Sequence, residues 1–429
     1  MITITPEERV LIIAPHPDDE SLACGALIQH AVAAGARVRV LFLTNGEKNP
    51  WPQRYVERRW RVSANDGARW GERRRAEALA ALDCFGLDEK VARFLYLPDT
   101  GLTRLLMQGG RSIVALLAGE MADFRPTLVV GPAGRDTHPD HSAAHVLLQL
   151  ALRQHGASGI RYLDYVVHGK PFALTATSVV IQLSPEEVRE KLAAILCHAT
   201  QMSLSRGRFC GYARPTELFH VVEPLRDEHP THPIYCAHEQ EDTLILKVRH
   251  SWPAFSTRRI LLAIEGEAGQ PVRWSLPLPM KSGKVPLRDE RSRETVCEVA
   301  ARWTRECTEL RVPLAGLPKR TAIFAKLDGS RLFFDQAGWR DVPTEQHSTH
   351  LLAQIDRVVE IQALVSSFYS RPQPSAIDAT PNMNISQLSA DVRASRGSAG
   401  PSPHADSTLP PADLRSRRRT PRIDGKDRN

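Results

Sequence analysis

Residues 10–20 read Val10-Leu11-Ile12-Ile13-Ala14-Pro15-His16-Pro17-Asp18-Asp19-Glu20. Four consecutive branched apolar residues are typical of a strand that is buried on both faces. The polar residues after them lead into residues 22–34, whose apolar spacing predicts a helix that ends at Gly35. A strand that passes through a polar turn into a helix is the repeating unit of an α/β fold.

The same alternation continues to about residue 223. Further strands are expected at 38–43, 94–97, 128–130, 162–167, 179–183 and 218–222, and further helices at 72–85, 113–124, 141–153 and 185–198. Parallel strands need crossover connections, which are usually helices. Residues 1–223 are therefore expected to form one domain with a Rossmann-like, mostly parallel sheet and helices on both faces.

The composition changes after residue 223. Prolines and histidines interrupt residues 224–242, which are expected to be a linker. Short runs of β character then continue to residue 345 and predict a smaller all-β, sandwich-like accessory domain over 243–345. Residues 346–369 have the apolar spacing of one closing helix. Residues 370–429 are rich in Pro, Ser and Ala and predict a disordered, basic tail.

Composition excludes several classes of protein. The 429 residues contain no apolar run long enough to span a membrane and no secretion signal before Val10, so we expect a cytoplasmic protein. Seven scattered cysteines without a C-x-x-C spacing indicate reduced thiols. The net charge of +7 includes a tail cluster, Arg415, Arg417, Arg418 and Arg419. We interpret this cluster as solubilising, with contact to RNA, anionic lipid or an acidic partner as the alternative.

Two short polar segments, here called packets, each follow an expected strand. The first packet is residues 14–20, after the strand at 10–13, and the second is Thr137-His138-Pro139-Asp140-His141, after the strand at 128–130. The carboxyl ends of parallel strands are where open α/β sheets build their sites. His16 and Asp19 are three residues apart and can project from the same turn between strand and helix. His138 and His141 have the same spacing and can lie on one face of the helix that follows. Two imidazoles and one carboxylate with an open fourth position are typical of catalytic zinc. One packet alone is explained by a proline turn with a capping aspartate, but two indicate a metal.

The remaining polar residues of the packets suggest catalytic roles. Asp18 lies beside the ligands and is the candidate general base for a metal-bound water. His138 would be free to protonate or polarise the developing oxyanion, with Asp140 holding its tautomer.

Three neighbouring residues could compete for these roles. His145 lies on the same helical face as His141 and is a rival ligand, although we favour a position in the core or behind the ligands. Glu20 is interpreted as a structural hydrogen-bond acceptor and Cys24 as a packed thiol.

Residues 49–70 form an unusual insertion after a strand, and are expected near the mouth of the site. The insertion holds Trp51, Tyr55, Trp60 and Trp70 among Arg54, Arg58, Arg59, Arg61 and Arg69. Aromatic rings can stack on sugars and arginines can bind phosphate or carboxylate, which would suit an anionic glycoconjugate. A surface helix with packed tryptophans and solvated arginines is the equal alternative.

The two packets resemble the motifs of the PIG-L/LmbE-like family of zinc-dependent N-deacetylases. The resemblance covers about residues 8–223, because further family-like segments occur in order: Thr44-Asn45-Gly46-Glu47, Arg74-Arg75-Ala76-Glu77, Leu97-Pro98-Asp99-Thr100-Gly101 and His198-Ala199-Thr200-Gln201. Some members carry a tyrosine two residues before the first histidine of the second packet. This chain departs from that pattern with Asp136 there, and the metal assignment stands.

The resemblance implies a set of site residues. Zinc would lie on His16, Asp19 and His141, with Asp18 as general base and His138 as electrophile or general acid. Arg74 and Asp99 would hold sugar hydroxyls of a substrate such as an N-acetylglucosaminide.

We therefore expect a zinc-dependent N-deacetylase, a hydrolase that removes an N-acyl group, foremost acetyl, from an amino sugar or glycoconjugate. Iron(II) or cobalt would also suit a mixed site of histidine and carboxylate. The alternatives are an amidase acting on a thiol-sugar adduct or a lipoglycopeptide, and a non-catalytic glycan-binding or interaction protein. Asp18 favours an enzyme, because a binding module needs no base beside its ligands. The expected partner is a small glycoconjugate, with no specific nucleic acid and no membrane span.

Overall fold

The computed structural model describes residues 3–156, 159–169, 178–221, 229, 231–250, 258–267, 271–329 and 334–344. All of them belong to one compact unit, Met1–Ala376. The expected closing helix (346–369) and basic tail (370–429) lie outside the described residues. None of the helices in the described ranges is long and apolar enough to cross a membrane.

Sheet A has seven strands in the spatial order β3-β2-β1-β4-β5-β7-β6. Their bounds are β1 (Arg9–Ala14), β2 (Arg37–Thr44), β3 (Ala92–Leu97), β4 (Leu128–Pro132), β5 (Arg161–Tyr165), β6 (Ser178–Gln182) and β7 (Thr216–Val221). The strands β1 to β5 pair in parallel, whereas β7 pairs antiparallel with both β5 and β6. The expectation of a mostly parallel sheet is confirmed.

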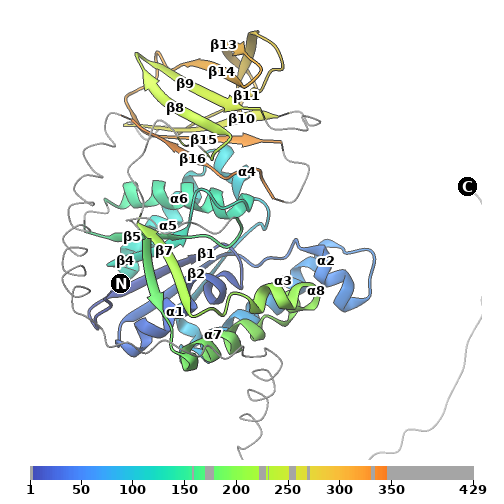
Figure 1. Ribbon diagram of the computed structural model, residues 1–429, viewed down its shortest axis with the longest axis vertical. Helices are drawn as coiled ribbons and strands as arrows, with labels where there is room; N and C mark the ends of the chain where they lie inside the picture. Colours follow the sequence, from blue (N-terminus) through green and yellow to red (C-terminus); the bar gives the residue numbers. More distant parts are fainter. Residues whose placement is uncertain are drawn as a thin grey trace, which may run out of the picture. The chain divides into compact units, whose positions relative to one another are not determined.

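Helices cover both faces of sheet A (Figure 1). They are α1 (Asp19–Ala33), α2 (Pro50–Glu57), α3 (Ala64–Cys84), α4 (Leu102–Met107), α5 (Arg111–Phe124), α6 (Pro139–His155), α7 (Pro185–Cys197) and α8 (Ala199–Cys210). The helices α4, α5 and α6 pack together on one face, where their apolar side chains share a core with Leu11, Ile13 and Val129 of the sheet. The helices α1, α3 and α7 pack together on the other face.

Sheet B has nine antiparallel strands in the order β16-β15-β10-β11-β12-β13-β14-β9-β8. Their bounds are β8 (Ile234–Gln240), β9 (Thr243–Arg249), β10 (Arg259–Gly266), β11 (Pro271–Pro277), β12 (Gly283–Asp289), β13 (Thr295–Trp303), β14 (Cys307–Pro313), β15 (Arg320–Asp328) and β16 (Arg340–Val342). The first strand, β8, also lies against β15 and β16. The expected sandwich of two sheets is therefore one continuous sheet that curls towards a barrel.

Two features explain this curling. Alternate residues of successive strands point into a single apolar core that includes Leu246, Leu262, Leu287 and Leu310. Register shifts in β8, β10 and β12 add local twist, as β-bulges do. Sandwich and barrel share the same period-2 pattern, so the sequence alone does not separate them.

Sheet B begins inside the segment that was expected to be a linker. The strand β8 starts directly after Pro233, and the prolines and histidines before it hide its β character in the sequence. Sheet B also shares the core of α5 and α6, to which it contributes Leu261, Ala263, Ala322 and Phe324, joined by Trp339 just before β16. The two sheets are thus parts of one packed unit.

Candidate active site

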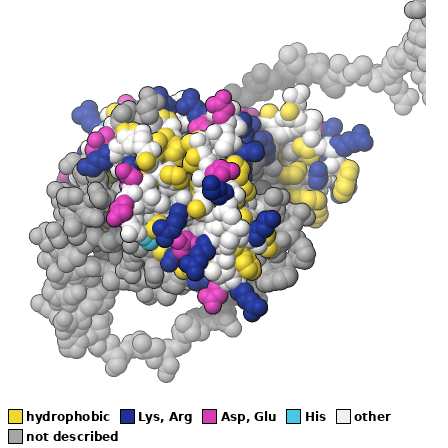
Figure 2. Space-filling view, turned by 90° about the horizontal axis from the view of Figure 1, so that it is seen from above, with side chains coloured by type: hydrophobic (Ala, Val, Ile, Leu, Met, Phe, Trp, Pro, Cys, Tyr) yellow, Lys and Arg dark blue, Asp and Glu magenta, His cyan; other side chains and the backbone are white. Residues whose placement is uncertain are grey.

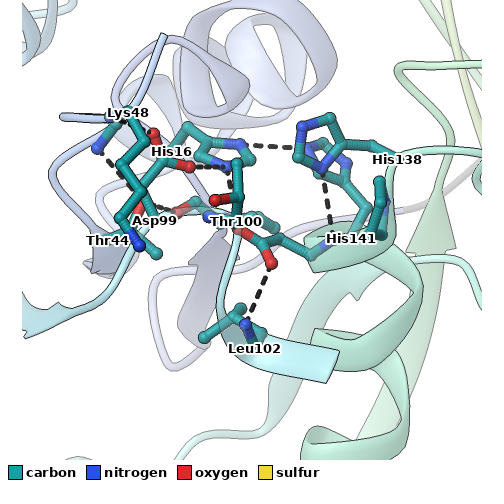
Figure 3. Close-up of polar contacts among 12 residues, drawn as sticks. His16, Thr44, Lys48, Asp99, Thr100, Leu102, His138 and His141 are labelled. Atoms are coloured by element: carbon teal, nitrogen blue, oxygen red, sulfur yellow. Dashed lines mark hydrogen bonds and ion pairs between the residues drawn. The ribbon is translucent and has the colours of Figure 1, made fainter. Parts of the chain in front are cut away.

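Turns at the carboxyl ends of β1, β2, β3 and β4 bring the expected site residues together (Figure 3). His16 follows β1, Lys48 follows β2, Asp99 follows β3 and His138 follows β4. The imidazoles of His16 and His141 face each other, with Asp99 beside His16. The two packets, more than 100 residues apart in the sequence, form one buried cluster.

Three side-chain atoms of this cluster form a small triangle. The His16 Nδ1 to His141 Nε2 distance is 3.3 Å, His141 Nε2 to Asp19 Oδ2 is 3.2 Å, and His16 Nδ1 to Asp19 Oδ2 is 3.5 Å. Tetrahedral ligands at zinc bond lengths lie about 3.3 Å apart. A nitrogen of His138 lies within 4.8 Å of nitrogens of both other histidines. The donor set and its spacing therefore fit one divalent cation.

Carboxylates dominate the electrostatics of the cluster. Burial alone would lower the pKa of His16, but the carboxylates of Asp140, Asp19 and Asp99 raise it well above its ordinary value. Burial also opposes protonation of His141, yet Asp19 and Asp136 raise its pKa to about 10. The negative charge around these imidazoles would be neutralised by a bound cation.

Hydrogen bonds to Glu20 and from Arg74 hold Asp18 in an unusual backbone conformation. Its φ of 146° lies in a region that favours glycine, so the backbone is strained there. Its N–H donates to Glu20 Oε2 at 3.0 Å, and its carboxylate accepts a hydrogen bond from Arg74 Nη2 at 3.0 Å. Burial raises the pKa of Asp18 to about 6, against the opposing effect of the Arg74 guanidinium. The carboxylate lies beside the triangle without being one of its corners.

Arg74, on α3, is buried and holds the turns around Asp18. It donates to Gly46 O at 3.0 Å and to Pro17 O at 2.7 Å in addition to the Asp18 carboxylate. Gly46 has a φ of 64°, and a Cβ there would overlap the Arg74 guanidinium. The structure thus places Arg74 behind the candidate base, and its contact with a substrate stays a prediction.

Asp99 and Asp140 line the other side of His16. Asp99 Oδ1 lies 3.2 Å from His16 Nε2, and its second oxygen accepts the Lys48 N–H at 2.7 Å. The Asp140 carboxylate accepts the N–H groups of Thr100 at 2.6 Å and Leu102 at 3.0 Å. These bonds connect the turn after β3 to the first turn of α6 (Figure 3).

His138 is the N-cap residue of α6. Its Nδ1 accepts the N–H of Asp140 at 3.2 Å, which leaves the hydrogen of the neutral ring on Nε2. Burial and the neighbouring histidines lower the pKa of His138 well below its ordinary value, so the ring is neutral. Asp140 was expected to hold the tautomer of His138, and it is the backbone N–H of Asp140 that contacts the His138 ring.

Two residues that the sequence analysis did not single out for the site lie in it. Asp136 Oδ2 is 3.2 Å from His141 Nδ1, and the Asp136 carboxylate accepts the N–H groups of His138, Val167 and His168. Carboxylates in this position orient metal-binding histidines. The ring of His168, which follows β5, lies 4.9 Å from that of His141. Its position after a strand was the only signal in the sequence.

The competing residues have structural roles. Glu20 accepts from His198 Nε2 at 3.0 Å and from the Asp18 N–H, as expected of a structural acceptor. His145 lies 3.3 Å from Tyr162 Oη and 3.4 Å from Asp341 Oδ1 rather than in the triangle. Cys24 is buried, and all seven cysteines are free thiols.

The aromatic residues of the insertion differ in their exposure, and contact with a substrate stays a prediction. Trp70 packs inside on α3 with 1% of its surface exposed, whereas Trp51, Tyr55 and Trp60 are exposed on and after α2. Arg54 lies over the rings of both Trp51 and Trp60. Hydrophobic and basic side chains occur together on the side where Figure 1 places α2 (Figure 2).

Comparison with known proteins decides the family. A model of the PIG-L (GlcNAc-PI de-N-acetylase) family matches residues 11–152, which contain both packets. The 1D-myo-inositol 2-acetamido-2-deoxy-alpha-D-glucopyranoside deacetylase of Mycobacterium sp. (strain KMS) is 30% identical over 243 residues, covering 47% of this chain and 77% of the relative. This chain belongs to the PIG-L family. The resemblance inferred from the motifs is confirmed.

Two further proteins are similar to parts of this chain. The deacetylase of the same name from Mycobacterium avium (strain 104) is 37% identical over 150 residues, which are 31% of this chain and 47% of the relative. A conserved protein of Thermus thermophilus, known from a crystal structure, is 26% identical with a TM-score of 0.39, covering 51% of this chain and 96% of its own.

Proposed function

We propose that this protein is a metal-dependent N-deacetylase that removes an N-acyl group, foremost acetyl, from an amino sugar or its glycoconjugate. One observation carries the proposal: His16, Asp19 and His141 form a triangle of ligand spacing, and the buried Asp18 carboxylate interacts electrostatically with two of these residues, Asp19 and His16. The Mycobacterium relatives, which deacetylate a 2-acetamido sugar by name, support the class of substrate.

His16, Asp19 and His141 would hold the cation, with zinc as first choice and iron(II) as a second. When bound, such a cation lowers the pKa of a coordinated water and polarises an amide carbonyl. Asp136 supports this role through its contact with His141 Nδ1, which turns Nε2 towards the other ligands.

The protein's own groups would move the protons. Asp18 takes a proton from the attacking water and returns it to the leaving amine, and a pKa of about 6 leaves its carboxylate ionised at neutral pH. Arg74 keeps that carboxylate in place. His138 Nε2–H donates a hydrogen bond to the carbonyl oxygen as negative charge develops there. Asp140 supports the neutral tautomer of His138 through its backbone N–H.

The substrate side is proposed from the polar groups around His16. Asp99 and Arg74 would receive sugar hydroxyls. The exposed aromatic rings and arginines of α2 would suit an anionic aglycone.

The seven cysteines are all free thiols, which fits a reducing compartment such as the cytoplasm. We also class residues 1–223 as a Rossmann-like catalytic domain, because its first five strands follow the order 3-2-1-4-5.

The test compares Asp18→Asn with His16→Ala. Bound metal is measured by elemental analysis, and amine release is measured on a panel of N-acetylated glycosides and nucleotide sugars. Asp18→Asn should keep the metal and lose turnover by about 10³-fold, because it removes only the base. His16→Ala should lose both metal and turnover. Full turnover by Asp18→Asn, or full metal content in His16→Ala, would contradict the proposal.

A further inference from the structure

A segment of sheet B reaches the turn that carries His138. Residues 334–341, which follow β15 and run into β16, lie against residues 134–142, and Figure 1 places β15 and β16 next to α6. The N–H of Asp335 donates to Thr137 O at 2.9 Å. A Cβ on Gly338 would come within 2.7 Å of Asp136 O and of the Ser142 Cβ. The two backbones therefore meet without room for a side chain.

Buried polar contacts fix this segment. Lys326 of β15 is 1% exposed and lies 2.5 Å from the Asp335 carboxylate. At the other end of the segment, Asp341 Oδ1 lies 3.4 Å from His145 on α6. Arg273 of β11, fully buried, donates to the carbonyls of Leu106 and Gly109 at 2.9 and 3.1 Å. Sheet B is thus locked to the helices that position the site.

The first described residue of the segment, Phe334, lies in the active site. Its ring centroid is 5.1 Å from that of His168 and 5.9 Å from that of His138. The rings of His138 and His168 are themselves 5.2 Å apart. Phe334 therefore adds an apolar surface to the side of His138, from a part of the chain almost 200 residues further on.

Successive side-chain contacts connect the polar Asp99 with Phe334 through His16 and His138. Asp99 contacts His16 at 3.2 Å, the His16 ring lies 4.7 Å from that of His138, and Phe334 follows beyond His138. A secondary amide is planar and trans, so its nitrogen substituent and its acyl chain point to opposite ends. If the sugar lies towards Asp99, the acyl chain points towards Phe334.

We propose that Phe334, in the connection between β15 and β16, is a specificity-determining residue that forms the apolar wall of the acyl pocket and limits the length of the acyl chain. This inference rests on the proposed deacetylase function. It assigns to sheet B a part in the site that residues 1–223 lack. The chemical class received at the wall is a short acyl group.

The test compares acyl chains of different length on one amino-sugar glycoside. The kcat/KM for N-acetyl and N-butyryl substrates is measured for wild type, Phe334→Ala and Phe334→Leu. Phe334→Ala should raise the butyryl-to-acetyl ratio about 10-fold or more, because each methylene in a fitted apolar pocket changes the ratio by about 10-fold. Phe334→Leu should give a smaller rise and also covers the case in which Phe334→Ala does not fold. The matched control is Phe324→Leu, which removes a ring from the same interface away from the site and should leave the ratio unchanged.

A binding measurement separates this inference from the proposed function. Acetate and butyrate, which have the chemistry of the acid products, are titrated by ligand-observed NMR into the metal-loaded full chain. Phe334→Ala should bind butyrate more tightly relative to acetate than wild type does. If wild type cleaves no amide, the proposed function falls while the binding ratio still decides the role of Phe334. An unchanged ratio in both measurements, with all substrates weakened equally, would overturn the inference.

Discussion

Asp18, Gly46 and Thr100 all have positive φ angles, and each lies in a turn at the end of a strand of sheet A. Asp18 and Thr100 are not glycines, so their conformations carry strain. Hydrogen bonds hold both: the Asp18 N–H to Glu20 and the Thr100 N–H to Asp140. The turns around the candidate metal site are therefore fixed before a ligand arrives.

Gly46→Ala tests the close approach of this turn to Arg74. The new methyl group would overlap the Arg74 guanidinium, so Arg74 would have to move away from Asp18. We expect a loss of turnover of about 10-fold or more, together with a lower free energy of unfolding, because the candidate base loses its fixed position. Gly35→Ala is the matched control, because Gly35 has a similar φ of 73° with nothing within 4 Å of the added Cβ. It should cost about 1 kcal/mol of stability and no turnover. Equal effects of both variants on turnover would contradict this account.

The site residues that lie in turns directly after parallel strands could be predicted from the sequence. His16, Asp19, His138 and His141 lie in short packets after strands, so their convergence followed from parallel-strand geometry. Phe334 lies between β15 and β16, and its contact with His138 depends on how sheet B packs against the α/β part. No local pattern contains that information.

Among the elements, α1, α7 and β7 meet at a buried ion pair. Lys191 of α7, 1% exposed, pairs with Glu217 of β7, whose carboxylate also accepts the N–H groups of Ala26 and Leu27 on α1 at 3.0 Å each. The sequence predicted the helix and the strand from their apolar spacing. It gave no sign that this lysine is buried, because a lysine in the pattern of a helix is ordinarily solvated.

The Lys191–Glu217 pair is expected to be strongly coupled. Glu217→Gln leaves a buried ammonium without its counter-charge and should lower the free energy of unfolding by about 3 kcal/mol or more. The double variant Lys191→Met/Glu217→Gln should cost clearly less than the sum of the two single variants. Denaturant unfolding of all four proteins measures the coupling. The exposed pair Arg189–Glu186 on the same helix is the control, for which we expect no measurable coupling. Additive effects at Lys191 and Glu217 would show that the pair does not act as described.

In the whole molecule, sheet B and the α/β part form one folded unit with a shared core. The mostly parallel sheet was predictable because strands and helices alternate in the sequence. The curled shape of sheet B was not, because β8 is hidden behind prolines and histidines and because closure depends on bulges. The shared core could not be predicted either, since an apolar strand residue reads the same whichever element it packs against.

His232 makes the junction between β8 and the segment 334–341 sensitive to pH. Its Nδ1 accepts the Ile234 N–H at 3.1 Å and its Nε2 donates to Gly338 O at 3.3 Å, which requires the neutral ring. Burial lowers the pKa of His232 to about 4, and the nearby Arg340 and His229 act in the same direction. The unfolded chain binds this proton near pH 6.5 and the folded protein does not. Stability should therefore be complete above pH 6.5 and fall by about 1.4 kcal/mol per pH unit between pH 6 and pH 4.

Urea unfolding of wild type and His232→Gln at pH 7, 6 and 5 isolates this contribution. The difference between the two proteins should shrink as the pH falls, because only the wild type has a histidine to protonate in the unfolded state. A difference that stays constant over this range would mean that His232 has the same pKa in the folded and the unfolded protein, which would contradict a buried neutral ring.

One divalent cation between His16, Asp19 and His141 is the feature on which the proposed chemistry depends. Crystals of the zinc-loaded protein, with diffraction recorded on both sides of the zinc absorption edge, test it most directly. The expected result is one anomalous peak about 2 Å from His16 Nδ1, Asp19 Oδ2 and His141 Nε2. A zinc-loaded crystal with no peak inside this triangle, or with its peak on other residues, would contradict the account.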